Sequence, residues 1–152
     1  MCQKKCSHKM IYEIPAFNFS NLEQGKYISK VIKKSEIKLN LIYSYNQLKW
    51  QGPLYVRDLF KKIQNKNIFF HVDCKNNYGS VLQVMRTEIS NIIFSSNDQI
   101  IDSKIMSLSE QYSSKIFSLK KFKKFYLINE TNDMKFFMKE FNSYFEKIKF
   151  FK

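Results

Sequence analysis

A regular alternation of strand-like and helix-like segments constrains the fold of this chain more than any other feature. Residues 67–94 read NIFFHVDCKNNYGSVLQVMRTEISNIIF. The β-branched and aromatic run at 68–72 predicts a strand, the apolar residues at helical spacing in 78–89 predict a helix, and the run at 91–95 predicts a second strand. Strands that alternate with helices across short turns predict right-handed crossovers and a parallel sheet.

The same alternation continues on both sides of this unit. Residues 37–44, IKLNLIYS, predict a strand, and Gly52 with Pro53 predicts the start of a helix, because proline is favoured in a first helical turn. Asp98 is placed to cap another helix, and 115–119 predicts a fourth strand. We therefore expect an α/β fold of about four mostly parallel strands, either flavodoxin-like or a half-barrel.

Flanking helices are predicted at both ends, over residues 21–34 and 131–149. The second helix carries an aromatic stripe that we expect to dock on the sheet. A length of 152 residues suits one domain, 1–152. Within it we expect an irregular segment at 1–20, the core at 37–119, and a basic connector with the C-terminal helix at 120–152.

The sequence predicts a cytoplasmic protein. It has no run of 18 apolar residues that could span a membrane. Its first residues, MCQKKCSHKM, lack the apolar stretch of a secretory signal. The three cysteines are an odd number, which does not suit a disulfide framework.

The formal net charge of +13 raises the question of a polyanionic partner. All but two of the 26 basic residues are lysines, alongside much Ile, Asn and Phe, a mixture that AT-rich codons encode. Basic and aromatic residues alternate in KKFKK, at residues 120–124, which makes this run a nucleic-acid candidate. A solvated connector is the alternative. The candidate residues are Lys120, Lys121, Lys123 and Lys124.

The carboxyl ends of the strands are where ligands bind in parallel α/β proteins. Asp73 and Cys74 lie there and are the catalytic candidates, as a proton-transfer group and as a nucleophile or metal ligand. Because a helix follows this strand closely, its free backbone N–H groups suit a small anionic ligand. The ligand-binding candidates at this edge are Asn46, Lys75, Asn77, Ser80, Ser95 and Ser96.

The sequence predicts no metal and no cofactor. His71 and Asp73 share one face of their strand while Cys74 points to the other, which is unsuited to a shared ion. Cys2, Cys6 and His8 form a C-x3-C-x-H cluster, but a structural zinc needs a fourth ligand. The phosphate-binding and dinucleotide-binding glycine motifs are also missing.

Residues 37–119 resemble the early βα units of class II fructose-bisphosphate aldolases. The resemblance rests on the GPLYVRDLF helix start, the strand ending in Asp73 and the strand SNIIFSS. The chain also resembles short uncharacterised alphaproteobacterial proteins with a Gly-Pro helix start and an Asp-Cys strand end, which implies a bacterial source. The aldolase resemblance implies a proton-transfer role for Asp73. The sequence departs from the aldolases at Cys74, where the family has a zinc-binding histidine, and at Ser95 and Ser96, where an acidic residue is expected.

A complete barrel of this type needs about 200 residues or more, so the resemblance implies a reduced barrel. The sequence favours a non-catalytic binding or interaction module. A small lyase or transferase acting on a phosphorylated metabolite through Asp73 and Cys74 is one alternative. A basic nucleic-acid or ribosome-associated protein is the other. Because unpaired edge strands invite pairing, a half-barrel also predicts a homo-oligomer.

Overall fold

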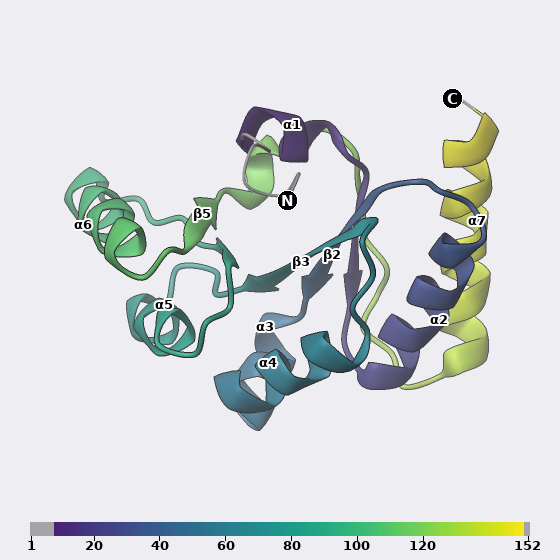
Figure 1. The fold of residues 1–152 in the computed structure, drawn as a ribbon, viewed down its shortest axis with the longest axis horizontal. Coiled ribbons are helices and arrows are strands. Elements are labelled where there is room, and N and C mark those ends of the chain that lie inside the picture. The colour runs from purple at the N-terminus through teal and green to yellow at the C-terminus, as the bar shows by residue number, and fades with distance from the viewer. Residues whose placement is uncertain (1–7, 151–152) are drawn as a thin grey trace.

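Six parallel strands form one open sheet in the computed structural model, which describes residues 8–150 (Figure 1). The strand order is β5-β4-β3-β2-β1-β6. The first five strands therefore follow one another across the sheet in chain order, as in a half-barrel, and β6 returns to pair with β1. The strands are β1 (Ala16–Phe19), β2 (Leu39–Tyr43), β3 (Ile68–Asp73), β4 (Asn91–Ile93), β5 (Lys115–Phe117) and β6 (Phe125–Tyr126).

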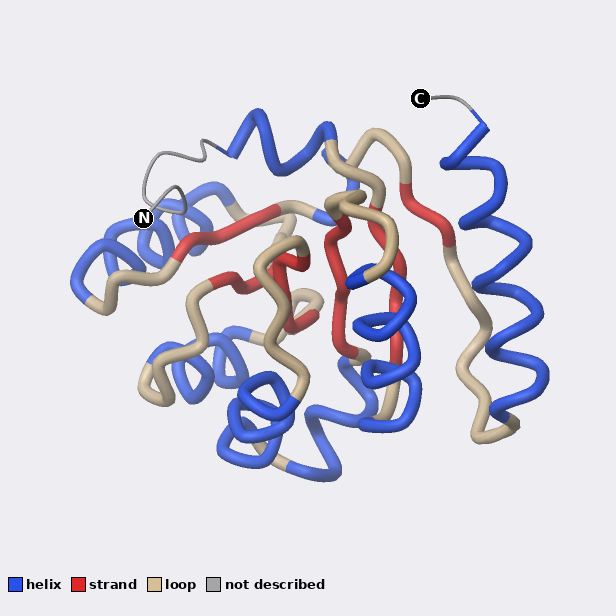
Figure 2. The backbone as a smooth tube through the Cα atoms, turned by 45° about the vertical axis from the view of Figure 1, so that its right-hand side comes forward, coloured by secondary structure: helices blue, strands red, loops and turns tan. Residues whose placement is uncertain are grey.

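Helices alternate with these strands, which confirms the predicted α/β class and both flanking helices. They are α1 (His8–Glu13), α2 (Leu22–Lys33), α3 (Tyr45–Gln51), α4 (Pro53–Lys62), α5 (Tyr78–Met85), α6 (Gln99–Gln111), the short 3-10 helix η2 (Leu119–Lys121) and α7 (Met134–Phe150). Figures 1 and 2 show α7 beside α2 at one end of the sheet and α6 at the other.

Different elements pack on the two faces of the sheet. Helices α2 and α4 to α7 bury apolar side chains in one large cluster with the strands, including Ile28, Val56, Val81, Ile105 and Phe141. The opposite face is covered by α1 and by the segment after β5, in a smaller cluster of buried residues. That cluster consists of Ile11, Ala16, Ile42, Ile93, Phe117 and Phe122.

The prediction that residues 1–20 are irregular is wrong for the described part, residues 8–20. This part forms α1 and then β1, which lies inside the sheet between β2 and β6. The backbone N–H of Ala16 donates to the Lys124 carbonyl oxygen at 2.8 Å, and that of Asn40 donates to the Pro15 carbonyl oxygen at 2.8 Å. Strands of four and two residues carry too little periodicity to be recognised locally, and their pairing is with distant segments.

Two further boundaries differ from the sequence-based expectation. Residues 45–51, between the predicted strand and the helix start at Gly52, form the helix α3, and the 120–124 connector leads into β6. The core consequently extends well beyond 37–119. The predicted helix cap at Asp98 is confirmed. Its side chain accepts hydrogen bonds from the backbone N–H groups of Ile100 and Ile101 at the start of α6.

Gly25 is a position where a side chain would displace its neighbours. A Cβ added there would lie 2.5 Å from Ile63 Cδ1 and 3.0 Å from Phe19 Cε2. We expect Gly25→Ala to lower the free energy of unfolding by about 1–3 kcal/mol in urea titrations, because overpacking forces neighbours off their rotamers. Gly79→Ala is the matched control, since its nearest contact would be an ordinary 3.5 Å to Asn77 Oδ1. Equal stability of the two variants would contradict this packing.

Within residues 8–150, no helix has the length and apolar character needed to cross a bilayer.

Candidate functional site

Asp73 closes a turn at the end of β3. Its Oδ1 accepts a hydrogen bond from the backbone N–H of Lys75 at 2.8 Å, and Lys75 has a φ of 49°. Burial raises the pKa of the Asp73 carboxyl, opposed by this hydrogen bond and by the Lys75 charge. The carboxylate does not cap α5. Asn77 does so, by accepting a hydrogen bond from the backbone N–H of Ser80 at 3.0 Å.

Cys74 points away from Asp73 into the large apolar cluster and is completely buried. Burial raises the pKa of the thiol far above its ordinary value, and the Asp73 charge raises it further. Because the thiolate is the reactive and metal-binding form, this environment disfavours both chemical roles considered for Cys74.

His71 lies on the opposite face, where it is fully buried and hydrogen-bonded. Its Nε2 lies 2.9 Å from Asn40 Oδ1, while Asn40 Nδ2 donates to the carbonyl oxygens of Ile11 (2.8 Å) and Ile14 (3.0 Å). Asn40 Oδ1 must accept, so the proton of His71 is on Nε2. Burial lowers the pKa of His71 to about 3, so the ring is neutral near neutral pH. This pair ties α1 to the centre of the sheet.

His71 and Cys74 therefore lie on opposite faces of the sheet, as the sequence predicts. Within the described residues 8–150, no group of three or more His, Cys, Asp or Glu side chains could hold a metal ion. Cys2 and Cys6 lie outside the described residues. The third member of their cluster, His8, packs its ring 4.5 Å from that of Phe117.

Two of the ligand-binding candidates gather around Tyr45. Asn77 Nδ2 donates to the Tyr45 hydroxyl at 2.8 Å, and Lys75 Nζ lies 5.3 Å from the centre of the Tyr45 ring. Asn46 directly follows Tyr45 but has a different partner: its Nδ2 lies 3.5 Å from Oε2 of Glu130. The structure therefore brings Lys75 and Asn77 together and directs Asn46 to another partner.

The remaining candidates belong to turns and helix starts. The backbone N–H of Ser95 donates to the Lys75 carbonyl oxygen at 3.1 Å. The Ser96 hydroxyl donates to Asp102 Oδ1 at 2.7 Å at the start of α6. Ser80 contributes its backbone N–H to the α5 cap. These polar groups hold their own loops together.

Glu130, in the loop after β6, makes contacts that the sequence did not indicate. It follows β6 and accepts a hydrogen bond from the Ser44 hydroxyl, next to its contact with Asn46. Ser44 directly follows β2, so this contact fastens the loop after β6 over the end of β2. No local signal could have indicated Glu130, because its partners lie more than 80 residues away along the chain.

The KKFKK run is a surface connector with a buried centre. Phe122 belongs to the smaller apolar cluster, with its ring 4.9 Å from Tyr12 and 5.5 Å from His71. It therefore cannot stack on a nucleic-acid base. Lys123 pairs with Glu13, and the other three lysines of the run are exposed.

No protein-family model matches the sequence, and no curated protein matches it. The resemblance to class II aldolases and to the alphaproteobacterial proteins stays a prediction that rests on residues 37–119.

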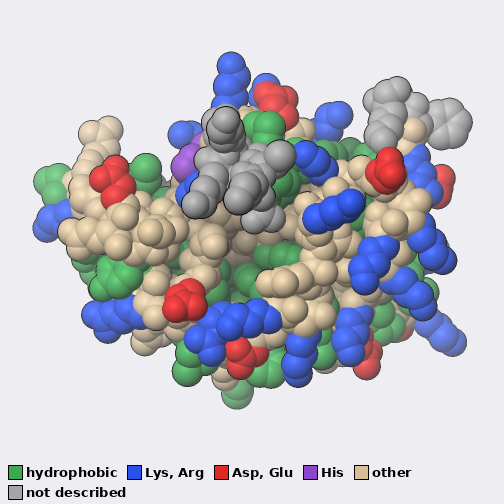
Figure 3. All heavy atoms as spheres, in the orientation of Figure 1, with side chains coloured by type: hydrophobic (Ala, Val, Ile, Leu, Met, Phe, Trp, Pro, Cys, Tyr) green, Lys and Arg blue, Asp and Glu red, His purple; other side chains and the backbone are tan. Residues whose placement is uncertain are grey.

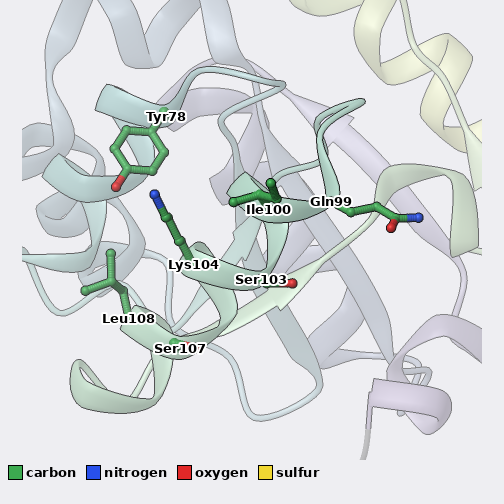
Figure 4. Close-up of a pocket in the computed structure, with 7 residues that line it drawn as sticks. All are labelled: Tyr78, Gln99, Ile100, Ser103, Lys104, Ser107 and Leu108. Carbon is green, nitrogen blue, oxygen red and sulfur yellow. The ribbon is translucent and has the colours of Figure 1, made fainter.

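The described residues form two surface hollows that bear on function. An open one of about 700 Å³ lies between α5 and α6. Figure 4 shows Lys104 and Leu108 extending toward Tyr78 there, while Gln99 and Ser103 point elsewhere. A second, of about 890 Å³, lies at the amino ends of β3, β4 and β5. We refer to it as the amino-end cleft.

The α3–α4 turn exposes large apolar side chains. Trp50 is 87% exposed, Leu54 58% and Tyr55 48%. We refer to these three residues as the tip surface. Gly52, with a φ of 83°, makes the turn between the helices, and Pro53 is the first residue of α4.

Proposed function

We propose that the protein is a non-catalytic interaction module, built on a reduced barrel scaffold, that docks through its tip surface on an anionic membrane surface. The observation that carries the proposal is the exposure of three large apolar side chains on either side of Gly52: Trp50 near the end of α3, and Leu54 and Tyr55 at the start of α4. Contiguous exposed apolar patches mark interaction sites, whereas single exposed apolar residues need no explanation.

The tip surface is held rigidly although its side chains are exposed. Leu48 in α3 and Val56 in α4 are buried in the large apolar cluster, so both helices are anchored next to the turn. Pro53 and the left-handed Gly52 fix the path of the chain between them. The three apolar side chains are therefore presented outward by a fixed scaffold.

The composition of the tip suits a lipid headgroup region. Tryptophan and tyrosine favour the membrane interface, and an aliphatic side chain such as Leu54 adds apolar area that can enter it. Lys49 lies next to Trp50 and is exposed. Basic residues near an anionic surface each contribute about 1 kcal/mol, and the cytoplasmic leaflet carries such a surface.

Other partners fit the tip less well. A second copy of this chain would bring two charges of +13 together, which opposes association at low ionic strength. A nucleic-acid strand would use the aromatic rings for stacking but would gain little from Leu54. The enzyme alternative lacks support in the geometry, because Cys74 is buried in the core and His71 is committed to Asn40.

Trp50 is the only tryptophan of the chain and reports directly on docking. We expect its fluorescence to shift to shorter wavelength with vesicles of phosphatidylcholine and phosphatidylglycerol, and to shift much less with phosphatidylcholine alone. The variant Leu54→Ser/Tyr55→Ser keeps the reporter. It should bind at least about tenfold more weakly, because burial of one large apolar side chain contributes about 1.5–3 kcal/mol.

The matched control is Ile100→Ser/Met106→Ser, which removes exposed apolar side chains from α6 and should bind like the wild type. Equal binding by the tip variant and this control would rule out docking through the tip. An unshifted Trp50 spectrum with vesicles, together with salt-sensitive quenching by oligouridylate, would support the nucleic-acid alternative instead.

A further inference from the structure

We propose that the amino-end cleft binds a small organic anion that joins a phosphate or carboxylate to a flat apolar body. The cleft lies between the end of α4, the turn before β4 and the start of β5. Its volume of about 890 Å³ lies within the range of small-molecule sites. Figure 3 looks onto a face that is hollowed near its middle, with hydrophobic side chains at the bottom and Lys and Arg side chains gathered below.

Aromatic side chains line the apolar part of the cleft. Phe69 and Phe70 are both half-buried, and as consecutive residues of β3 they point to opposite faces of the sheet. Phe69 packs against the smaller cluster, whereas Phe70 packs against the large one. Phe70 is stacked on Phe60 with ring centres 5.1 Å apart, and Phe60 also lines the cleft. A fixed aromatic surface of this kind favours a flat apolar ligand, because offset stacking adds to the burial of apolar area.

Cations dominate the polar part. Arg57 and Lys61 come from successive turns of α4, Lys66 from the loop that follows, and Lys115 from the start of β5. Glu88 is the one acidic residue among the residues that line the cleft. Four cations against one carboxylate create a positive potential at the cleft, which attracts an anion.

The charges of Lys61 and Lys66 are not neutralised by the protein. Within residues 8–150, neither side chain makes an ion pair or a hydrogen bond. Arg57 pairs only with its neighbour Asp58, at 3.2 Å and partly exposed, an arrangement that contributes little to stability. Three cations can therefore turn to a ligand without breaking a strong internal contact.

This is where the amino-end cleft differs from the carboxyl edge of the sheet. At the carboxyl edge, Asn77 contacts Tyr45 and Ser96 contacts Asp102. In the cleft, the side chains of Gln64, Ser90 and Asn91 make no hydrogen bond within the described part of the chain. They can orient polar groups of a ligand, as the few polar groups of small-molecule sites do.

Phenyl phosphate is the probe that combines both features of the proposed ligand. We expect it to raise the melting temperature and to shift the NMR signals of Phe60, Phe70 and Lys66. Inorganic phosphate should bind more weakly, and phenol at the same concentration should leave these signals unchanged. The experiment contains no lipid, so its outcome does not depend on docking through the tip surface.

Two charge-reversal variants make the test specific. Lys61→Glu/Lys66→Glu should raise the Kd for phenyl phosphate by about tenfold or more, because truncating or reversing close charges removes favourable electrostatic free energy. Lys30→Glu/Lys33→Glu makes the same change in net charge on the exposed side of α2 and should leave the Kd unchanged. Equal Kd values for the two variants, signal changes elsewhere, or no binding of phenyl phosphate would overturn the proposal.

Discussion

Replacement of Phe141 by alanine is expected to lower the free energy of unfolding by about 3–5 kcal/mol, the usual loss for a large aromatic side chain in a core. Phe141 is fully buried in α7. Its ring centre lies 4.9 Å from that of Phe17 in β1 and 5.9 Å from that of Tyr27 in α2. Truncation would leave a cavity among three elements that come from opposite ends of the chain.

The control for this prediction is Phe136→Ala in the same helix, where the ring is 39% exposed. Urea unfolding of the two variants should differ by several kcal/mol if α7 docks on β1 and α2. A small loss in both variants would show that the helix contributes little to the folded state. A large loss at Phe141 would establish residues 16–19 and the C-terminal helix as parts of one core.

Acid is expected to destabilise the protein through His71. The pKa of this ring is lowered from 6.5 to about 3 by burial, so the unfolded chain binds a proton between these values and the folded chain does not. The contribution of the neutral His71 to the free energy of unfolding is complete above about pH 6.5. It decreases by about 1.4 kcal/mol per pH unit as the pH falls toward 3. The raised pKa of Asp73 acts in the opposite direction near its own titration range.

His71→Asn isolates this effect. At neutral pH the variant should be less stable than the wild type by about 1–3 kcal/mol, because it weakens the contact with Asn40. The difference should shrink as the pH falls, since only the wild type loses the histidine contribution. Urea midpoints at several pH values measure it. Parallel curves for the two proteins would contradict a buried neutral His71.

His8→Asn is the comparison variant for the acid experiment. The pKa of His8 is also lowered, mainly by burial, but its side chain is less buried than that of His71. Its removal should therefore change the slope of stability against pH less than removal of His71. This comparison separates the titration of the sheet histidine from a general effect of lost positive charge.

The central elements could be predicted because their signals are local. The strand before Asp73, the Pro53 helix start and the Asp98 cap each depend on residues within one or two turns, and all three are present. The alternation of His71 and Cys74 to opposite faces also follows directly from strand geometry. The aromatic stripe of the last helix, including Phe137, Phe141 and Phe145, is buried as expected.

For the candidate site, the sequence could predict which residues follow the strand but not the environment of their side chains. Asp73 and Cys74 do lie at the end of β3, but the properties of Cys74 come from the packed cluster around it. The cap of α5 is Asn77, which directly precedes the predicted helix. Glu130 and the amino-end cleft involve residues brought together by pairing and packing across the sheet.

The sequence by itself determined the parallel α/β alternation of residues 37–119, because hydrophobic periodicity and turn residues act over short distances. Only the tertiary structure decided the strand order, the inclusion of β1 and β6, and the cover that α1 provides for the second face. It also decided which polar side chains form hydrogen bonds within the protein and which remain accessible to a ligand. These properties depend on contacts between residues such as Asn18 and Ile128, whose 2.6 Å hydrogen bond joins positions 110 residues apart.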